Sequence, residues 1–426
     1  MALFGRKNHS DEQPVDVPPV ETVVTQAPVP QRSVPEQRAF LLSQVQPLRP
    51  FGMSILDAEG LTLCEDIVSD LNLPLVTTAQ TAGFGLRASD IVGASPQSPA
   101  SLFLVGAIAE GETPGMALAS GTAIEVAEGA LVPEGVDAVV PHSEAQVSGD
   151  QVHVIAEATY QQNLRLAGSE LAEGTPLVSE GATLTPRSIA ALAEVGYDKV
   201  LVRPRPRVVV ITVGDHLVAP GQPLTAAYQR YDAVTALISA AASQCHANVS
   251  PMGVIRSESL QQVLADQLTR ADLVVVVGGG AHAFEVVSRL GQLDQADVPI
   301  NGVDRYGFAA IEDRVPVMLL PGGVVSAFLG YELFVRPVLA RLNDAPVPTT
   351  PTAFGKMSEY YRSVEGVTEY VPAVLDADGD VTPVAGRGAE LAHDLVRANV
   401  LAVIPDFWGE AGAGSEVQCL LLDPPR

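Results

Sequence analysis

The segment that most constrains the fold runs from Val274 to Ser288 and has the sequence VVVVGGGAHAFEVVS. Four consecutive β-branched residues predict a buried parallel strand. Three glycines follow, Gly278, Gly279 and Gly280, and their backbone can turn tightly and offer N–H groups to an anion. The next residues, Ala281 to Phe284, carry almost none of the polar side chains that a catalytic loop needs. The segment therefore predicts either a phosphate-binding loop without catalytic groups or merely a tight turn.

Length and charge exclude several classes of protein. A chain of 426 residues exceeds one compact core and should form several domains. Its net charge of -25 argues against nucleic acid as a partner, because phosphate would be repelled. No uncharged apolar run approaches the ~20 residues that a bilayer requires, and the first residues lack the apolar segment of a signal peptide. The cysteines Cys64, Cys245 and Cys419 lack metal-type spacing. We expect a cytoplasmic protein without membrane insertion.

The pattern along the chain predicts a mixed α/β and β, multi-domain fold. Residues 1–32 are rich in proline and are expected to be a disordered tail, either a tether or a docking motif. Ser33 and Glu36 form a capping box before a helical pattern, and helical segments are expected at 35–66 and 186–195. The expected domains are a helical, elongated subdomain I (33–75 and 166–204), an inserted β subdomain II (76–165), a doubly wound α/β subdomain III (205–342), and a C-terminal β-barrel or sandwich, subdomain IV (349–426).

Six motifs occur in a recognisable order. They are GFGLR at 83–87, EGALVPEGVDAVV at 128–140, NLRLAGSEL at 163–171, PRVVVITVGDHL at 206–217, LLPGGVVSAF at 319–328, and Arg397-Ala398-Asn399. In sequence and order they resemble the molybdopterin molybdenumtransferase family of MoeA and the gephyrin E domain. The resemblance implies an L-shaped protomer of four subdomains and a head-to-tail homodimer. It also implies an active site between protomers, where adenylylated molybdopterin and molybdate meet carboxylates, hydroxyls and a divalent metal.

The polar positions of that family site are largely changed in this chain. Ala82 falls on a family aspartate beside Gly83, Glu128 on a threonine, and His216 on the glutamate of G-D-E-L. Glu285 lies one position away from a family aspartate, which falls on Val286. The site positions that we single out are Ala82, Gly83, Glu128, Glu170, Asp215, His216, Asp232, Gly278, Gly279, Gly280 and Glu285. We interpret them as a degenerate site with no metal and no cofactor, and we expect His216 and His282 to be structural.

An alternative remains open: the chain is a divergent but working molybdenumtransferase. In that case Glu285, Glu128 and Asp232 supply replacement carboxylates. Mg²⁺ and adenylylated molybdopterin are then expected to bind.

The resemblance also implies a peptide site. In gephyrin, a groove at the dimer interface holds a receptor peptide between a helix phenylalanine and proline and tyrosine residues of the last subdomain. The phenylalanine falls on Phe40 and the proline on Pro405, while the tyrosine falls on Ala411, with Phe407 and Trp408 as substitutes. The chain looks similar to the actinobacterial gephyrin-like proteins. That similarity implies a homodimeric scaffold that binds the FtsZ C-terminal tail, together with a membrane receptor, at the division septum.

Overall fold

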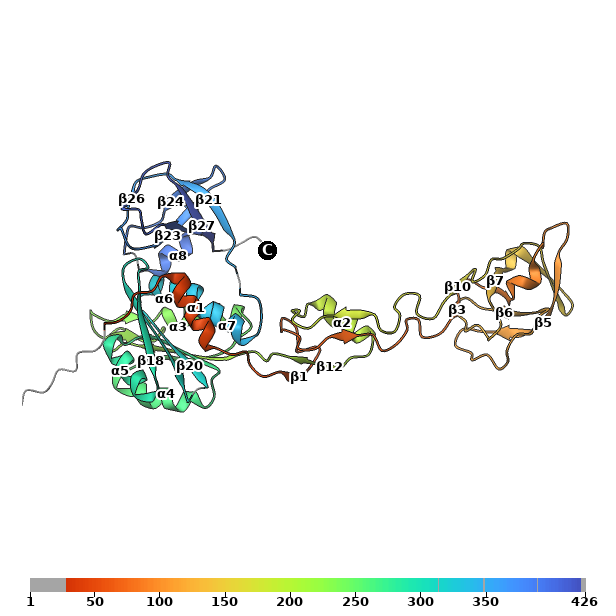
Figure 1. Cartoon of the computed structure of the whole chain (residues 1–426), viewed down its shortest axis with the longest axis horizontal. Coiled ribbons are helices and arrows are strands. Elements are labelled where there is room, and N and C mark those ends of the chain that lie inside the picture. The colour runs from red at the N-terminus through yellow and green to blue at the C-terminus, as the bar shows by residue number, and fades with distance from the viewer. Residues whose placement is uncertain (1–27, 313, 348, 389, 423–426) are drawn as a thin grey trace, which may run out of the picture.

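The protein is elongated, with two domains at one end and a third at the far end of a thin connection (Figure 1). The computed structural model describes residues 28–422 apart from 313, 348 and 389. Most of the expected tail, residues 1–27, lies outside this range. Among the described residues, no helix is long and apolar enough to cross a membrane.

The α/β domain has a six-stranded sheet with helices on both faces. Four strands are parallel, and the last two run antiparallel at one edge, in the order β16-β13-β17-β20-β19-β18. The strands are β13 (Arg207–Val213), β16 (Asn248–Ile255), β17 (Leu273–Gly278), β18 (Leu293–Val298), β19 (Asp304–Ile311) and β20 (Val315–Leu320). The helices are α3 (Val234–Gln244), η3 (Ser257–Ser259), α4 (Leu260–Leu268), α5 (Gly280–Leu290), α6 (Val324–Gly330), the π-helical turn η4 (Tyr331–Val335) and α7 (Arg336–Leu342).

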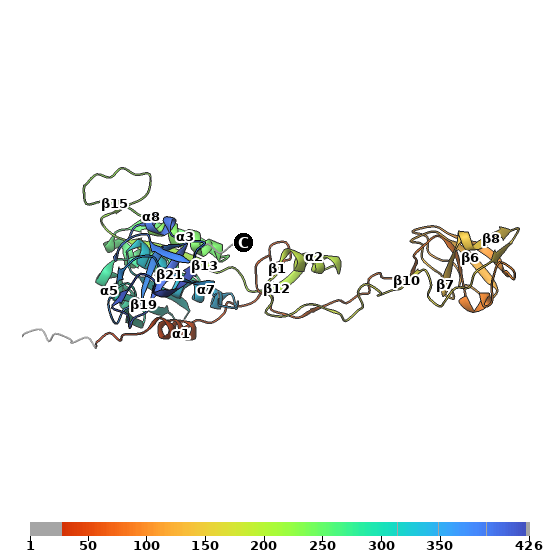
Figure 2. The same cartoon turned by 90° about the horizontal axis from the view of Figure 1, so that it is seen from above.

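Alternation of side chains along β13 and β17 fills two separate cores. Val208, Val210, Val275 and Val277 pack against α3, η4 and α7, whereas Val209, Ile211, Val274 and Val276 pack against α4 and α5. A strand that is buried on both faces needs a continuous apolar run, which is what the valine-rich sequences supply. Between β13 and α3 the short strands β14 (Leu217–Val218) and β15 (Arg230–Tyr231) bound a loop that projects from the domain (Figure 2).

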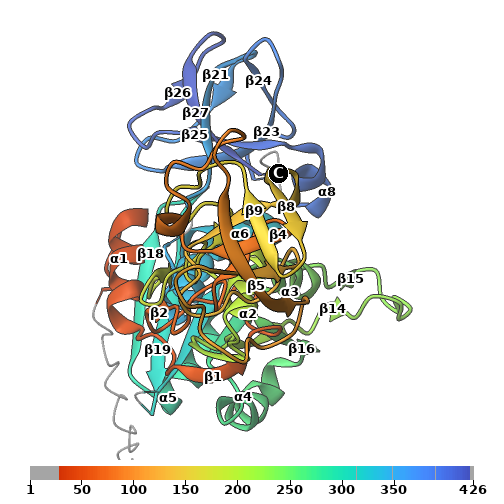
Figure 3. The ribbon, with the colours of Figure 1, turned by 90° about the vertical axis from the view of Figure 1, so that its right-hand side faces the viewer.

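Helix α1 (Val34–Gln44) packs on this α/β domain and not on the elongated part with which it was expected to fold. Leu41 and Val45 are buried in the same core as α3 and α7, and α1 lies beside β18 (Figure 3). The capping box is present, because Glu36 Oε2 accepts hydrogen bonds from the backbone N–H and the hydroxyl of Ser33, each 2.8 Å long. These bonds lower the pKa of Glu36. The helix expected to continue to residue 66 ends at Gln44, and β1 (Phe51–Ser54) lies within that range.

The elongated connection consists of two chain segments that pair at three places. β1 pairs with β12 (Lys199–Val202), β2 (Ile67–Val68) with β11 (Pro176–Val178), and β3 (Thr78–Ala79) with β10 (Leu164–Arg165). Helix α2 (Pro186–Glu194) covers a small core that includes Leu61, Leu192 and Val202. The all-β domain follows at the far end as a sheet in the order β7-β4-β6-β5-β9-β8. Its elements are β4 (Gly83–Leu86), η1 (Ala88–Ile91), β5 (Ala100–Ile108), β6 (Thr122–Val126), β7 (Ala138–Pro141), η2 (His142–Glu144), β8 (Ala145–Ser148) and β9 (Gln151–Val154).

The C-terminal domain is a closed five-stranded barrel in the order β21-β24-β23-β25-β27. Its elements are β21 (Thr352–Met357), β22 (Tyr361–Arg362), β23 (Glu369–Leu375), β24 (Asp380–Pro383), α8 (Ala392–Arg397), β25 (Val400–Ile404), β26 (Glu410–Ala411) and β27 (Glu416–Leu421). The mixed α/β and β architecture, with a doubly wound domain and a C-terminal barrel, confirms the expected fold class.

Asp232 stabilises the N-terminus of α3. Its carboxylate is buried, and Oδ1 accepts hydrogen bonds from the backbone N–H groups of Val234 (3.0 Å) and Thr235 (3.1 Å) at the start of α3. Asp232→Ala should lower the free energy of unfolding by about 1 kcal/mol, while Asp232→Asn should keep most of it, because an amide oxygen can accept the same bonds. Urea denaturation followed by circular dichroism measures both variants; equal stability of Asp232→Ala and wild type would contradict this role.

Candidate functional site

The carboxyl edge of the α/β sheet carries the glycine loop. Gly278, Gly279 and Gly280 all have left-handed φ angles, of +81°, +76° and +50°. A Cβ atom on Gly278 would lie 2.7 Å from the carbonyl oxygen of Val213, so a side chain has no room there. The Gly279 N–H donates to the Val213 carbonyl (3.1 Å), and the 11-residue helix α5 begins at Gly280. A helix N-terminus after a parallel strand is a favourable place for an anion.

Side chains from two neighbouring loops meet beside the glycine loop at Ser257. Asp215, which follows β13, accepts hydrogen bonds from the Ser257 N–H (3.1 Å) and hydroxyl (3.2 Å). The Nε2 atom of His282, on the first turn of α5, lies 3.0 Å from the Ser257 carbonyl oxygen. This contact fits the structural role expected for His282. Together with the Asp215 bonds, it links the loops that follow β13, β16 and β17 at the carboxyl edge of the sheet. His216 is exposed on the same loop as Asp215.

Glu285 and Asp232 contribute differently to this edge. Glu285 is exposed on α5 and forms an ion pair with Arg289 one turn away. Asp232 is buried, and its Oδ1 is used in capping α3. Neither residue meets Asp215 in a cluster: within the described residues, no group of three His, Cys, Asp or Glu side chains is arranged to hold a metal ion. The described residues of one chain therefore offer no set of three such protein ligands at this edge.

The remaining candidate positions lie in the other arm of the molecule. Ala82 directly precedes β4, Gly83 is its first residue, and Glu128 is exposed in the turn after β6. Glu170 is exposed and forms an ion pair with Arg165 on the connection. β4 and β6 lie at the opposite end of the molecule from α5 (Figure 1). One chain therefore does not bring these positions to the glycine loop.

The barrel reaches the same edge of the sheet through Glu390. Its carboxylate accepts hydrogen bonds from the Val325 N–H (2.9 Å), the Ser326 N–H (3.3 Å) and the Ser326 hydroxyl (2.9 Å) at the start of α6. Burial raises the pKa of the nearby Asp304, and the Glu390 charge raises it further, against a hydrogen bond from Ser326. The backbone also comes close here, since a Cβ on Gly322 would lie 3.3 Å from Gly278 Cα.

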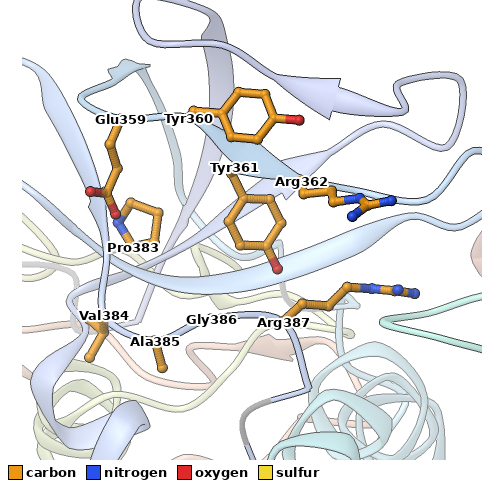
Figure 4. A pocket seen from close by; sticks show the side chains of 9 residues that line it. All are labelled: Glu359, Tyr360, Tyr361, Arg362, Pro383, Val384, Ala385, Gly386 and Arg387. Atoms are coloured by element: carbon orange, nitrogen blue, oxygen red, sulfur yellow. The ribbon is translucent and has the colours of Figure 1, made fainter.

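A pocket in the barrel was not anticipated from the sequence (Figure 4). It has a volume of about 460 Å³ and is lined by Glu359, Tyr360, Tyr361, Arg362, Pro383, Val384, Ala385, Gly386 and Arg387. Arg387 Nε donates to Glu369 Oε1 (2.8 Å), and Glu369 is only 1% exposed. Burial, together with the Glu369 charge, raises the pKa of Tyr361. Among the described residues, Arg362 forms no ion pair, and Glu369 Oε2 has no hydrogen-bond partner. The signal in the sequence was Glu359-Tyr360-Tyr361-Arg362, in a chain with few basic residues.

The expected peptide-binding residues occupy two surfaces. The Phe40 ring is half-buried, with its centroid 6.1 Å from that of Phe308 and the Arg32 guanidinium carbon 4.3 Å above it. Phe407 is 72% exposed and packs edge-on against the Trp408 ring, and the backbone N–H of Trp408 donates to the Pro405 carbonyl (3.0 Å). A separate cavity of about 1020 Å³ lies between α1, η4 and the barrel, and includes Val34, Arg38 and Leu42 in its lining. The side chain of Phe40 is not part of that lining.

Comparison with known proteins identifies the framework. A family model for the MoeA N-terminal region (domain I and II) matches residues 32–196, and one for the MoeA C-terminal region (domain IV) matches residues 355–422. Molybdopterin molybdenumtransferase 2 of Mycobacterium tuberculosis (strain ATCC 25618 / H37Rv) is 30% identical over 403 residues, which cover 91% of this chain and 98% of the relative. The molybdopterin molybdenumtransferase of Bacillus subtilis (strain 168) is 27% identical over 378 residues, or 84% of this chain and 87% of that protein.

The solved structures agree with the sequence matches. A molybdopterin biosynthesis MoeA protein from Pyrococcus horikosii superimposes with a TM-score of 0.80 at 25% identity, over 93% of this chain and 100% of that chain. The family resemblance inferred from the six motifs is thus confirmed. The chain belongs to the MoeA family, whose relatives in this comparison are named molybdopterin molybdenumtransferases.

Proposed function

We propose that the chain is a divergent molybdopterin molybdenumtransferase that binds an anionic substrate against the glycine loop. The observation that carries this proposal is the run of three left-handed glycines, Gly278 to Gly280, between a parallel strand and the N-terminus of α5. Backbone N–H groups in such a turn and the helix dipole both favour negative charge. The names of the relatives, which match along nearly the whole chain, support the same activity.

Two further features bear on the proposed substrate binding. Asp215 fixes the Ser257 loop through two hydrogen bonds and so keeps the edge of the sheet in place. In the barrel pocket, Arg362 has no ion-pair partner among the described residues, and guanidinium groups bind phosphate-like oxyanions well. We assign these groups to substrate binding and assign no reaction step to Mg²⁺.

The proposed site requires a second protomer. Glu128 and Glu170 lie in the arm that extends away from the glycine loop, so a head-to-tail homodimer is the arrangement that brings the two sets together. In that arrangement Glu128 and Glu170 of one protomer supply carboxylates to the loop of the other. The proposal therefore includes a homodimer as the active form.

A second candidate is a catalytically inactive scaffold that needs no cofactor. It is favoured by the apolar residues at polar family positions, Ala82, Ala281 and Val286, and by the exposed ring of Phe407. In this candidate function the homodimer binds an extended peptide, the FtsZ C-terminal tail, with a membrane receptor at the division septum. Phe40, Pro405, Phe407 and Trp408 are its proposed contact residues.

Reconstitution tests the first candidate. Purified protein given adenylylated molybdopterin, molybdate and magnesium should release molybdenum cofactor, and Gly278→Ala should lower turnover at least about tenfold, because a Cβ atom meets the Val213 carbonyl in a strained backbone. Gly149→Ala is the matched control: Gly149 also has a left-handed φ, of +65°, but its Cβ would meet nothing within 4 Å. Asp215→Asn provides a milder variant if Gly278→Ala does not fold. Absence of turnover in the wild-type homodimer would reject the transferase proposal.

Calorimetry tests the second candidate. A synthetic FtsZ C-terminal tail should bind the wild-type protein, and Phe40→Ala and Phe407→Ala should each weaken binding by about 2 kcal/mol, or roughly thirtyfold, since buried apolar anchors dominate peptide affinity. His216→Ala, on the sheet edge, should leave the affinity within about threefold. Light scattering should give a homodimer mass. Unchanged affinity in both phenylalanine variants would place the peptide elsewhere.

A further inference from the structure

The outer edge of the α/β sheet is covered by the chain's own N-terminal segment. β18 is the last strand of the sheet, and residues 30–32 run parallel to it, with Gln31 opposite Asp297. The Asp297 N–H donates to the Pro30 carbonyl (2.9 Å), and the Arg32 N–H donates to the Asp297 carbonyl (3.0 Å). The segment thus satisfies edge groups that would otherwise be open to pairing with another chain.

The side chain of Arg32 holds this segment in place. Its guanidinium donates to both carboxylate oxygens of Asp294, at 2.6 and 2.9 Å, and to Gln37 Oε1 at 3.0 Å. It also lies over the Phe40 ring, 4.3 Å from the centroid. The hydrogen bond to Asp294 raises the pKa of Arg32. Bidentate pairing and stacking on an aromatic ring together are specific for arginine.

We propose that β18 is a docking edge for an extended, arginine-bearing segment of another polypeptide, and that Pro30–Arg32 occupy this edge until such a segment displaces them. The resident segment defines the chemistry of the ligand: a main chain that pairs in parallel with Asp297, and a guanidinium that reaches Asp294 and Phe40. Strand addition to a free sheet edge is a common mode of peptide recognition, in which the main chain gives affinity and side chains give specificity.

Charge and covalent linkage both favour binding of residues 30–32 at the β18 edge of the same chain. The net charge of -25 favours basic over acidic segments. At the edge itself the Asp294 carboxylate pairs with Arg32, whereas the Asp297 carboxylate is paired with Arg305. The resident segment is tethered to α1 and therefore competes at a high effective concentration. A partner gains access when the Arg32 contacts are weakened. This inference is independent of both candidate functions, although Phe40 would be shared with the peptide site of the second.

Hydrogen exchange tests whether Arg32 holds the segment. In full-length Arg32→Ala, the Asp297 amide should exchange at least about tenfold faster, because losing the ion pair and the ring contact favours local opening. The matched control is Arg207→Ala, which removes a comparable bidentate pair: Arg207 donates to both oxygens of Asp272, at 3.0 and 2.8 Å, on β13 of the same sheet. Asp297 should exchange at the wild-type rate in this control. An unchanged rate in Arg32→Ala would overturn the proposal.

Fluorescence anisotropy tests the docking edge itself, with a labelled peptide of the sequence of residues 28–33 as the probe. The peptide should bind full-length Arg32→Ala at least about tenfold more tightly than wild type or Arg207→Ala, since the edge is then released. Replacing the arginine of the peptide by alanine, or combining Arg32→Ala with Asp294→Asn, should abolish this gain. Thermal melting monitored by circular dichroism checks that the variants are folded. A peptide that binds Arg32→Ala no better than wild type, although Asp297 exchanges faster, would show that residues 30–32 only tie down the chain.

Discussion

The α/β domain depends on the close approach of three backbone segments at the carboxyl edge of its sheet. A Cβ atom on Gly278 would lie 2.7 Å from the Val213 carbonyl oxygen, which leaves no room for a side chain, and one on Gly322 would make a tight 3.3 Å contact with Gly278 Cα. Strands β13, β17 and β20 can therefore end side by side while α5 begins at the same point. The Ser257 loop and Glu390 of the barrel then attach to this edge through hydrogen bonds. The same glycines place the N-terminus of α5 at this edge, where the first N–H groups of the helix have no intrahelical partner and can bind a ligand.

The parts of the fold that were predictable are those that local sequence determines. The valines of β17 are fully buried, as a run of β-branched residues requires, and α2 occurs where a helix was expected, at 186–195. The position of α1 was not predictable, because an amphipathic helix does not specify which domain covers it. Residues 46–66 read as helix but form β1 and loops, since their partners, such as β12, are supplied from far along the chain. Such tertiary pairing overrides local propensity.

The candidate site also has one part that was predictable from the sequence and another part that depends on tertiary structure. Asp215 and the glycine loop follow neighbouring parallel strands, so their proximity follows from the topology alone. The barrel pocket brings residues 359–362 next to residues 383–387, and only closure of the barrel creates that contact. The position of Glu128 and Glu170 depends on the long connection between domains, which short-range patterns do not reveal. Sequence patterns therefore located the glycine loop but neither the barrel pocket nor the separation of Glu128 and Glu170 from that loop.

The strongly acidic character of the chain bears differently on large and small anionic ligands. A nucleic acid would contact a wide area and meet the repulsion of many carboxylates, whereas a small oxyanion responds mainly to charges within about 8 Å at physiological ionic strength. Several arginines are neutralised in pairs that join distant segments, such as Arg32 with Asp294 and Arg387 with Glu369. Arg362, by contrast, has no ion-pair partner among the described residues and lines the barrel pocket. A small anion can pair with a single free guanidinium in a pocket even in a chain of net charge -25, so overall acidity is compatible with an anionic substrate.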